Sequence, residues 1–138
     1  MKNEEHLEQC AFFDWLRLAC PAIYEVTFAI PNGGKRDIRT ATKLKKEGVK
    51  PGVPDIFIAH PIFNKCCGSF IEMKSKTGKL SETQKYMIKL LTKDDNYYVF
   101  VAYGWEKARD FVMAHYWDRC HTLKSLAKAL NLTKANNL

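Results

Sequence analysis

The chain has 138 residues, of which 46% are hydrophobic and 27% charged, and its formal net charge is +7. These fractions lie close to globular averages, so they exclude a disordered chain, a collagen-like repeat and a disulfide-stapled mini-protein. The longest apolar run, Tyr97–Tyr103, is far shorter than the ~20 residues of a membrane helix. Acidic residues follow Lys2 at once, unlike a secretory leader. We therefore expect a single soluble domain over residues 1–138, located in the cytoplasm.

The charge is unevenly distributed along the chain. Residues 1–31 carry two basic and five acidic groups, whereas residues 32–52 carry seven basic and two acidic groups. This basic belt suits a polyanion such as nucleic acid, although a solvated basic helix explains the charge alone equally well. Its members are Lys35, Arg36, Arg39, Lys43, Lys45, Lys46 and Lys50.

The cysteines show no metal-binding pattern. There are five, an odd number, without a C-x-x-C pair or a zinc-type spacing to histidine. Reduced thiols are the default in a cytosol, and we expect them here.

In the first part of the chain, apolar periodicity predicts a helix over Glu4–Ala19, which Pro21 ends. Its apolar stripe comprises Leu7, Ala11, Trp15 and Leu18. Alternation over Ile23–Ile30 then predicts a half-buried strand, with Tyr24, Val26 and Phe28 on one side and Glu25 and Thr27 on the other.

A turn at Pro31–Gly34 leads to a short basic helix over Asp37–Glu47, which Gly48 ends. We expect Ile38, Ala41 and Leu44 to point inward from this helix.

The middle of the chain predicts a β-hairpin, from apolar, β-favouring segments at Asp55–Ala59 and Ser69–Ser75. Ser81 and Gln84 form a capping box that opens a helix ending near Leu91.

Beyond it, Tyr97–Tyr103 predicts a central strand, followed by helices at Trp105–Trp117 and Thr122–Leu130. The element order indicates an α/β fold with a mixed β-sheet flanked by helices.

One constellation of residues points to chemistry. Glu72 and Lys74 share a strand face because strand side chains alternate, and Asp55 opens the neighbouring strand. If the strands pair, two carboxylates converge beside an ammonium, a set that suits Mg²⁺ or Mn²⁺ and phosphodiester hydrolysis. An ion-paired group at a strand edge is the alternative.

The first helix offers a third carboxylate. Glu5 and Gln9 share a helix face, and Glu8 is the other candidate. Acidic residues also stabilise a helix N-terminus electrostatically, and this structural role is the alternative explanation for them.

The sequence resembles the VRR-NUC (virus-type replication-repair nuclease) family of the PD-(D/E)xK superfamily, in its stand-alone phage or bacterial form. The resemblance spans about residues 4–112, leaving extra C-terminal helices at 113–138. The matching sequence motifs are Glu5-x-x-x-Gln9, Pro31–Arg36, Leu44–Asp55, Glu72-Met73-Lys74 and Gly78–Gln84.

The resemblance implies a restriction-endonuclease-like αβββαβ core and a metal-dependent endodeoxyribonuclease. It implies that Asp55, Glu72 and the Met73 backbone carbonyl bind Mg²⁺ or Mn²⁺, with Glu5 as a further candidate ligand. Lys74 is then the catalytic lysine, Glu5 the helix-one acid and Gln84 a polar residue facing the site. For Gln84, the capping box is a sufficient role by itself.

The resemblance also implies a DNA partner. Asn32, Lys35 and Arg36 are expected near the scissile phosphate or the DNA backbone, with Lys76 and the rest of the basic belt as further DNA contacts. Stand-alone members resemble homodimeric enzymes that cut Holliday-junction-like branched DNA, in a bacterial or phage-infected cell. A flap nuclease, a non-catalytic nucleic-acid-binding module of the same fold and a metal-free partner-binding protein are the alternatives.

Overall fold

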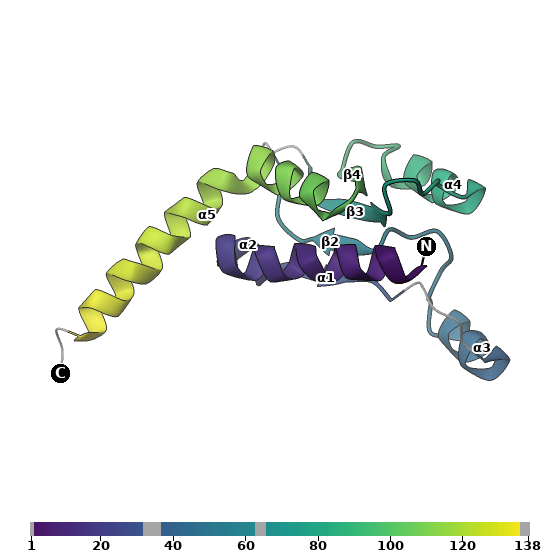
Figure 1. The fold of residues 1–138 in the computed structure, drawn as a ribbon, viewed down its shortest axis with the longest axis horizontal. Coiled ribbons are helices and arrows are strands. Elements are labelled where there is room, and N and C mark those ends of the chain that lie inside the picture. Colours follow the sequence, from purple (N-terminus) through teal and green to yellow (C-terminus); the bar gives the residue numbers. More distant parts are fainter. Residues whose placement is uncertain (1, 32–36, 63–65, 136–138) are drawn as a thin grey trace.

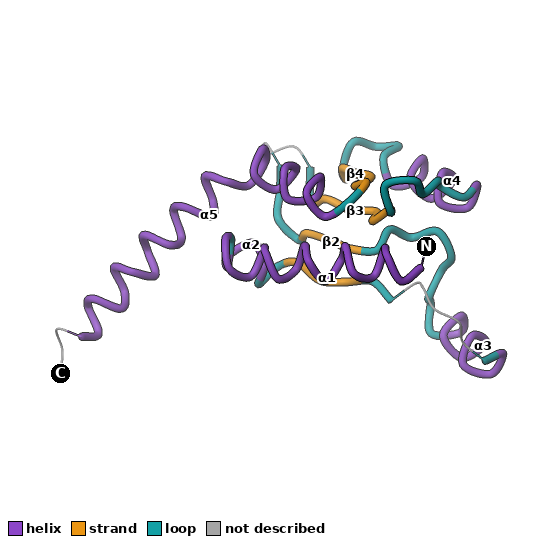
Figure 2. The backbone as a smooth tube through the Cα atoms, in the orientation of Figure 1, coloured by secondary structure: helices purple, strands orange, loops and turns teal. Residues whose placement is uncertain are grey.

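A four-stranded mixed sheet lies at the centre of the computed structural model, which describes residues 2–31, 37–62 and 66–135. The strand order is β1-β2-β3-β4, with β1/β2 and β2/β3 antiparallel and β3/β4 parallel (Figures 1 and 2). The predicted α/β class with flanking helices is confirmed. The strands are β1 (Thr27–Ala29), β2 (Ile56–Ile58), β3 (Gly68–Lys74) and β4 (Tyr97–Tyr103).

The predicted hairpin is present as β2 and β3, with Phe57 opposite Phe70. The chain then crosses through α4 (Glu82–Leu91) to reach β4. The prediction that β4 is central was wrong, because among the described strands it pairs with β3 alone. Its apolar character comes from a covering helix instead, as Phe100 stacks on Phe111 with ring centroids 4.8 Å apart.

One face of the sheet is covered by α1 (Lys2–Ala19) and by the N-terminal part of α5 (Trp105–Ala135), whose C-terminal part extends beyond the sheet (Figure 1). The core between them and the sheet includes Phe12 and Leu16. The predicted stripe on α1 was partly wrong, since Leu7 and Leu18 are 60% and 68% exposed. Phe12 and Leu16, which are four residues apart, lie on a neighbouring face of the helix, and that face is the buried one.

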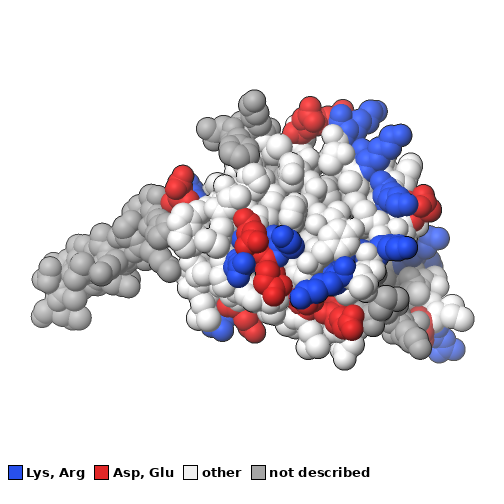
Figure 3. Space-filling view, turned by 45° about the horizontal axis from the view of Figure 1, so that its top comes forward, with Lys and Arg blue, Asp and Glu red and all other residues white. Residues whose placement is uncertain are grey.

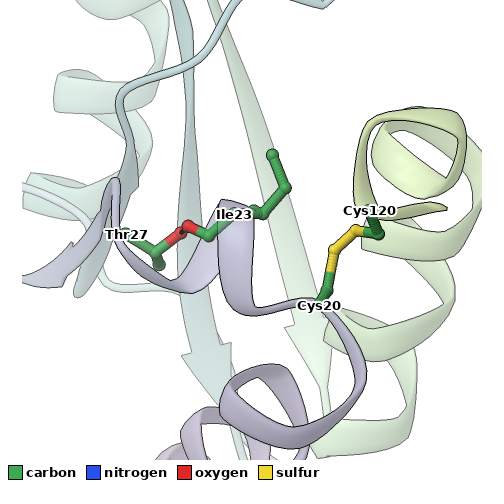
Figure 4. Close-up of a disulfide and its surroundings, with 4 residues drawn as sticks. All are labelled: Cys20, Ile23, Thr27 and Cys120. Carbon is green, nitrogen blue, oxygen red and sulfur yellow. Dashed lines mark hydrogen bonds between the residues drawn. A yellow bond between two sulfur atoms is a disulfide. The ribbon is translucent and has the colours of Figure 1, made fainter. Parts of the chain in front are cut away.

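The predicted strand over Ile23–Ile30 is shorter than expected and has the opposite face buried. Pro21 starts a helical turn, α2 (Pro21–Tyr24), where its fixed φ is favourable. In β1, Thr27 is buried, whereas Phe28 is 52% exposed. The Thr27 hydroxyl can be buried because it donates to the Ile23 carbonyl at 2.6 Å (Figure 4).

The basic helix forms as α3 (Ile38–Lys46), capped by Asp37, and it ends before Gly48, whose φ is +96°. The predicted inward face was wrong: α3 buries no residue, and Ile38 is 85% exposed. The helix projects away from the sheet (Figure 1), so it meets no apolar surface. In the predicted turn before it, residues 32–34 lie outside the described part of the chain.

The C-terminal segment is one helix, α5, rather than the two predicted, because no Gly or Pro interrupts residues 118–121. The structure also joins Cys20 to Cys120 in a disulfide with Cα atoms 4.9 Å apart (Figure 4), contrary to the expected reduced thiols. A pairing across 100 residues leaves no local trace in sequence. In the described part of the chain, no helix has the length and apolarity needed to cross a membrane.

Candidate functional site

A cleft of about 780 Å³ opens at the end of the sheet where β3 finishes. Five parts of the chain contribute to it: the first turns of α1, the end of β1 with the segment after it, the loop before β2, the end of β3, and the start of α4 with the loop before it. All five residues proposed from sequence as catalytic line this cleft, namely Glu5, Asp55, Glu72, Lys74 and Gln84.

Asp55 stands immediately before β2. Its Oδ2 accepts a hydrogen bond from the Met73 backbone N–H at 2.8 Å. Ile56 pairs with Ile71, so extending this register by two residues places Pro54 opposite Met73. Proline has no N–H to donate to the Met73 carbonyl. The N–H and C=O of a strand residue point to the same side, so that carbonyl faces the Asp55 side of β3.

Glu72 is almost completely enclosed, with 1% of its surface exposed. Its Oε1 accepts hydrogen bonds from the Lys74 ammonium, at 3.1 Å, and from the Gln84 side-chain amide. Burial raises the pKa of Glu72 to about 7, with a further upward contribution from the charge of Asp55. Burial likewise raises the pKa of Asp55. Two carboxylates here share a pocket in which both cannot easily carry charge.

Lys74 lies between two acids, with its Nζ 3.1 Å from Glu72 Oε1 and 3.6 Å from Glu5 Oε1. Burial alone would lower the pKa of Lys74. The hydrogen bond and charge of Glu72, with the charges of Glu5 and Asp55, outweigh burial and leave the pKa raised. Lys74 is therefore held as a cation.

The structure distinguishes the two candidate acids of the first helix. Glu5 is directed toward Lys74 in the cleft. Glu8 is engaged elsewhere, because its Oε2 accepts a hydrogen bond from the Trp105 backbone N–H at 2.6 Å. That N–H belongs to the first turn of α5, where a carboxylate satisfies an otherwise unpaired donor.

Gln84 contacts both the helix cap and a residue of the cleft. Its Oε1 accepts from the Ser81 backbone N–H at 2.9 Å, completing the predicted capping box with the Ser81 hydroxyl. Its Nε2 donates to Glu72. One amide has both an acceptor and donors, so the cap and the site contact coexist.

The described members of the predicted DNA-contacting set lie outside the cleft lining. Arg39, Lys43, Lys45 and Lys46 are exposed on α3, and Lys50 and Lys76 are exposed in loops. Lys and Arg side chains gather toward the end of the molecule that carries α3 and α4 (Figure 3). Asn32, Lys35 and Arg36 are not among the described residues.

Sequence reasoning assigned no role in the site to several residues that shape the cleft. His6, Gln9 and Lys79 line it. Gly52 has a φ of +82°, and a Cβ there would come within 2.5 Å of the Thr83 backbone oxygen. Only glycine therefore lets the loop before Asp55 pack against the start of α4. Nothing in the Pro51-Gly52 dipeptide of the sequence indicates this contact.

The donor set fits a hard divalent cation. Asp55 and Glu72 each have one carboxylate oxygen bonded to protein, and a carboxylate has two oxygens. The Met73 carbonyl adds a third oxygen donor. The described residues contain no cluster of three His, Cys, Asp or Glu side chains suited to a metal.

A mixed sheet with helices on its faces thus carries this group of acids at its end. The VRR-NUC domain model matches residues 2–106, so the chain has a nuclease-type fold and belongs to the VRR-NUC family.

A solved structure described as a VRR_NUC domain protein has the same fold. It superposes with a TM-score of 0.69 at 23% sequence identity, covering 82% of this chain and 88% of that chain. No curated protein matches the sequence.

Proposed function

We propose that this chain is a divalent-metal-dependent DNA endonuclease that hydrolyses phosphodiester bonds in branched DNA. The observation that carries the proposal is the convergence of Asp55, Glu72 and Lys74 in one cleft, with Glu72 and Lys74 buried and only 3.1 Å between their charged atoms. Family membership supports nuclease activity.

Mg²⁺ or Mn²⁺ would be held by Asp55, Glu72 and the Met73 carbonyl. When bound, the ion would supply a Lewis acid that offsets the charge growing on the phosphate. The Met73 N–H fixes the orientation of Asp55, and Gln84 fixes that of Glu72. These contacts preorganise the acids, so little reorganisation is needed when the substrate arrives.

Lys74 acts on the phosphate or the attacking water. An ammonium carries only donors, so Lys74 can stabilise developing negative charge or orient the water. Glu5 lies 3.6 Å from the Lys74 ammonium. That contact positions the ammonium toward the cleft.

We further propose a homodimer that cuts Holliday-junction-like DNA, because two sites are needed to cut two strands and stand-alone members resemble such enzymes. The chain would act in the cytoplasm of a bacterial or phage-infected cell. The exposed basic residues of α3 would contact the phosphate backbone, where lysine and arginine release counterions.

The test compares a labelled four-way junction, 5′ flap, splayed arm, single strand and duplex with Mg²⁺, Mn²⁺ or EDTA. We expect cutting of the junction with either metal and none in EDTA. Asp55→Asn and Lys74→Met should each lower the rate by at least about 100-fold. Lys85→Met is the matched control, because Lys85 is an exposed lysine of α4 paired with Glu82.

Sedimentation measures the oligomeric state in parallel. If the protein cuts the junction as a monomer, the proposed homodimer is wrong but the proposed nuclease activity stands. Salt-sensitive binding of every substrate without cutting in any metal would overturn the nuclease proposal. It would instead support the non-catalytic binding module.

A further inference from the structure

Four aromatic side chains cross the sheet on the face opposite α1 and α5. Phe28 of β1 meets Phe57 of β2 with ring centroids 5.7 Å apart, and Phe57 meets Phe70 of β3 at 4.6 Å. Tyr97 of β4 lies 5.6 Å from Phe70. We call these four residues the aromatic row.

The row is accessible, and its packing depends on a glycine. Phe28 is 52% exposed and Tyr97 36%, while Phe57 and Phe70 are half-buried. A Cβ at Gly68 would come within 2.6 Å of the Phe57 ring, so glycine allows this ring to lie across β3. On this face, α4 packs against β4. Solvent therefore reaches the β1 end of the row.

The strand register places the row beside the candidate site. Phe57 lies two residues after Asp55 along β2 and the residue before it, and Phe70 lies two residues before Glu72 in β3. Each pair therefore shares a sheet face. Phe57 is opposite Phe70, and the same register puts Asp55 opposite Glu72. The two acids therefore lie about 7 Å along the strands from the rings.

We infer that the aromatic row is a binding subsite for unpaired nucleobases of the DNA strand whose phosphate lies at Asp55 and Glu72. The inference rests on the proposed function and specifies its substrate as DNA with unstacked nucleotides next to the cut. Aromatic rings stack on any base and so recognise single strands without sequence preference. The net charge of +7 attracts a polyanion such as DNA to the molecule.

The test measures the affinity of a short fluorescent oligothymidylate by anisotropy in EDTA, where the proposed cutting is prevented. The comparison probes are an abasic oligonucleotide of equal length, which has the phosphates without the bases, and a blunt duplex. We expect Phe28→Leu to weaken oligothymidylate binding about tenfold. It should leave the abasic and duplex affinities unchanged.

Tyr86→Leu is the matched control, because Tyr86 is 62% exposed on α4 and lies outside the row. It should alter no affinity. Tyr97→Leu is the second test variant and should reproduce the base-dependent loss. Circular dichroism verifies that each variant is folded.

Equal effects of Phe28→Leu on the oligothymidylate and abasic probes would overturn the inference, as would no effect of either row variant. Conversion of a dimer to a monomer by Phe28→Leu, with base affinity unchanged, would overturn it in favour of a self-association surface. These readouts need no catalysis. If the protein cuts the junction but the row variants lose no base-dependent affinity, the subsite is refuted and the nuclease proposal stands. If the row variants lose base-dependent affinity but the protein cuts nothing, the nuclease proposal is refuted and the subsite stands.

Discussion

Gln84 connects the start of α4 to Glu72. The carbonyl oxygen of its side chain accepts the Ser81 backbone N–H at 2.9 Å, while its amide nitrogen donates to the Glu72 carboxylate. The helix cap and the orientation of a candidate metal ligand thus depend on one side chain. Substitutions at the two ends of the capping box can separate these roles.

We predict that Gln84→Ala lowers both stability and nuclease activity. Loss of a capping interaction costs about 1 kcal/mol, and loss of the donor leaves Glu72 less firmly oriented. Ser81→Ala is the matched control, since it removes the cap but keeps the Glu72 contact. Urea unfolding should show similar losses for both variants, while cleavage should fall about tenfold only in Gln84→Ala. Equal activity in the two variants would contradict a positioning role.

The stability of the metal-free chain should depend on pH through Glu72. Its pKa is raised from 4.5 to about 7 in the folded chain, so between these values the folded state holds a proton that the unfolded state releases. The free energy of unfolding should therefore fall as pH rises from about 4.5 to 7, by up to about 3 kcal/mol. Denaturant titrations in EDTA measure it. Glu72→Gln should flatten this slope, and an unchanged slope would contradict the assignment.

Metal binding should offset the fall in the free energy of unfolding that we expect at higher pH. Mg²⁺ at about 100 times its Kd should stabilise the chain by about 2.7 kcal/mol, seen as a higher Tm at pH 8. Asp55→Asn keeps an acceptor for the Met73 N–H but removes the charge, and it should abolish the Tm increase. Asp14→Asn, at an exposed acid of α1, should retain it. Stabilisation of Asp55→Asn by Mg²⁺ would place the metal elsewhere.

The basic side chains of α3 should contribute salt-dependent affinity without sequence preference. Each of Lys43→Ala and Lys46→Ala should weaken DNA binding and lower the slope of log affinity against log salt by about 0.9. Arg119→Ala, at an exposed position of α5, is the control. Anisotropy at several salt concentrations gives the slopes. Unchanged slopes in the α3 variants would remove this helix from the interface.

Thiol counting should distinguish the disulfide from the reduced state expected from sequence. With Cys20 and Cys120 joined, the unfolded, unreduced chain should expose three thiols, those of Cys10, Cys66 and Cys67. After reduction all five should react, and the stability should fall by about 2–4 kcal/mol because the closed loop spans 100 residues. Five reactive thiols before reduction would contradict the pairing.

The sequence by itself determined the features that local chemistry dictates. Ser81 and Gln84 predict the start of a helix, because both partners of the capping box lie within four residues of sequence. The hairpin of β2 and β3 follows from two apolar segments of short spacing. The alternation of side chains along a strand then places Glu72 and Lys74 on one face. The sequence motifs around Asp55 and Glu72 indicated the family.

Tertiary structure decided which faces are buried and which acids meet. Periodicity cannot distinguish Leu7 from Phe12 as a core residue, because burial depends on what packs opposite the helix. For the same reason Phe28 is exposed and Thr27 buried. Glu5 reaches Lys74 while Glu8 caps α5, since that choice depends on where α1 crosses the sheet. Contacts between residues far apart in the chain leave no local pattern, and these contacts form the site.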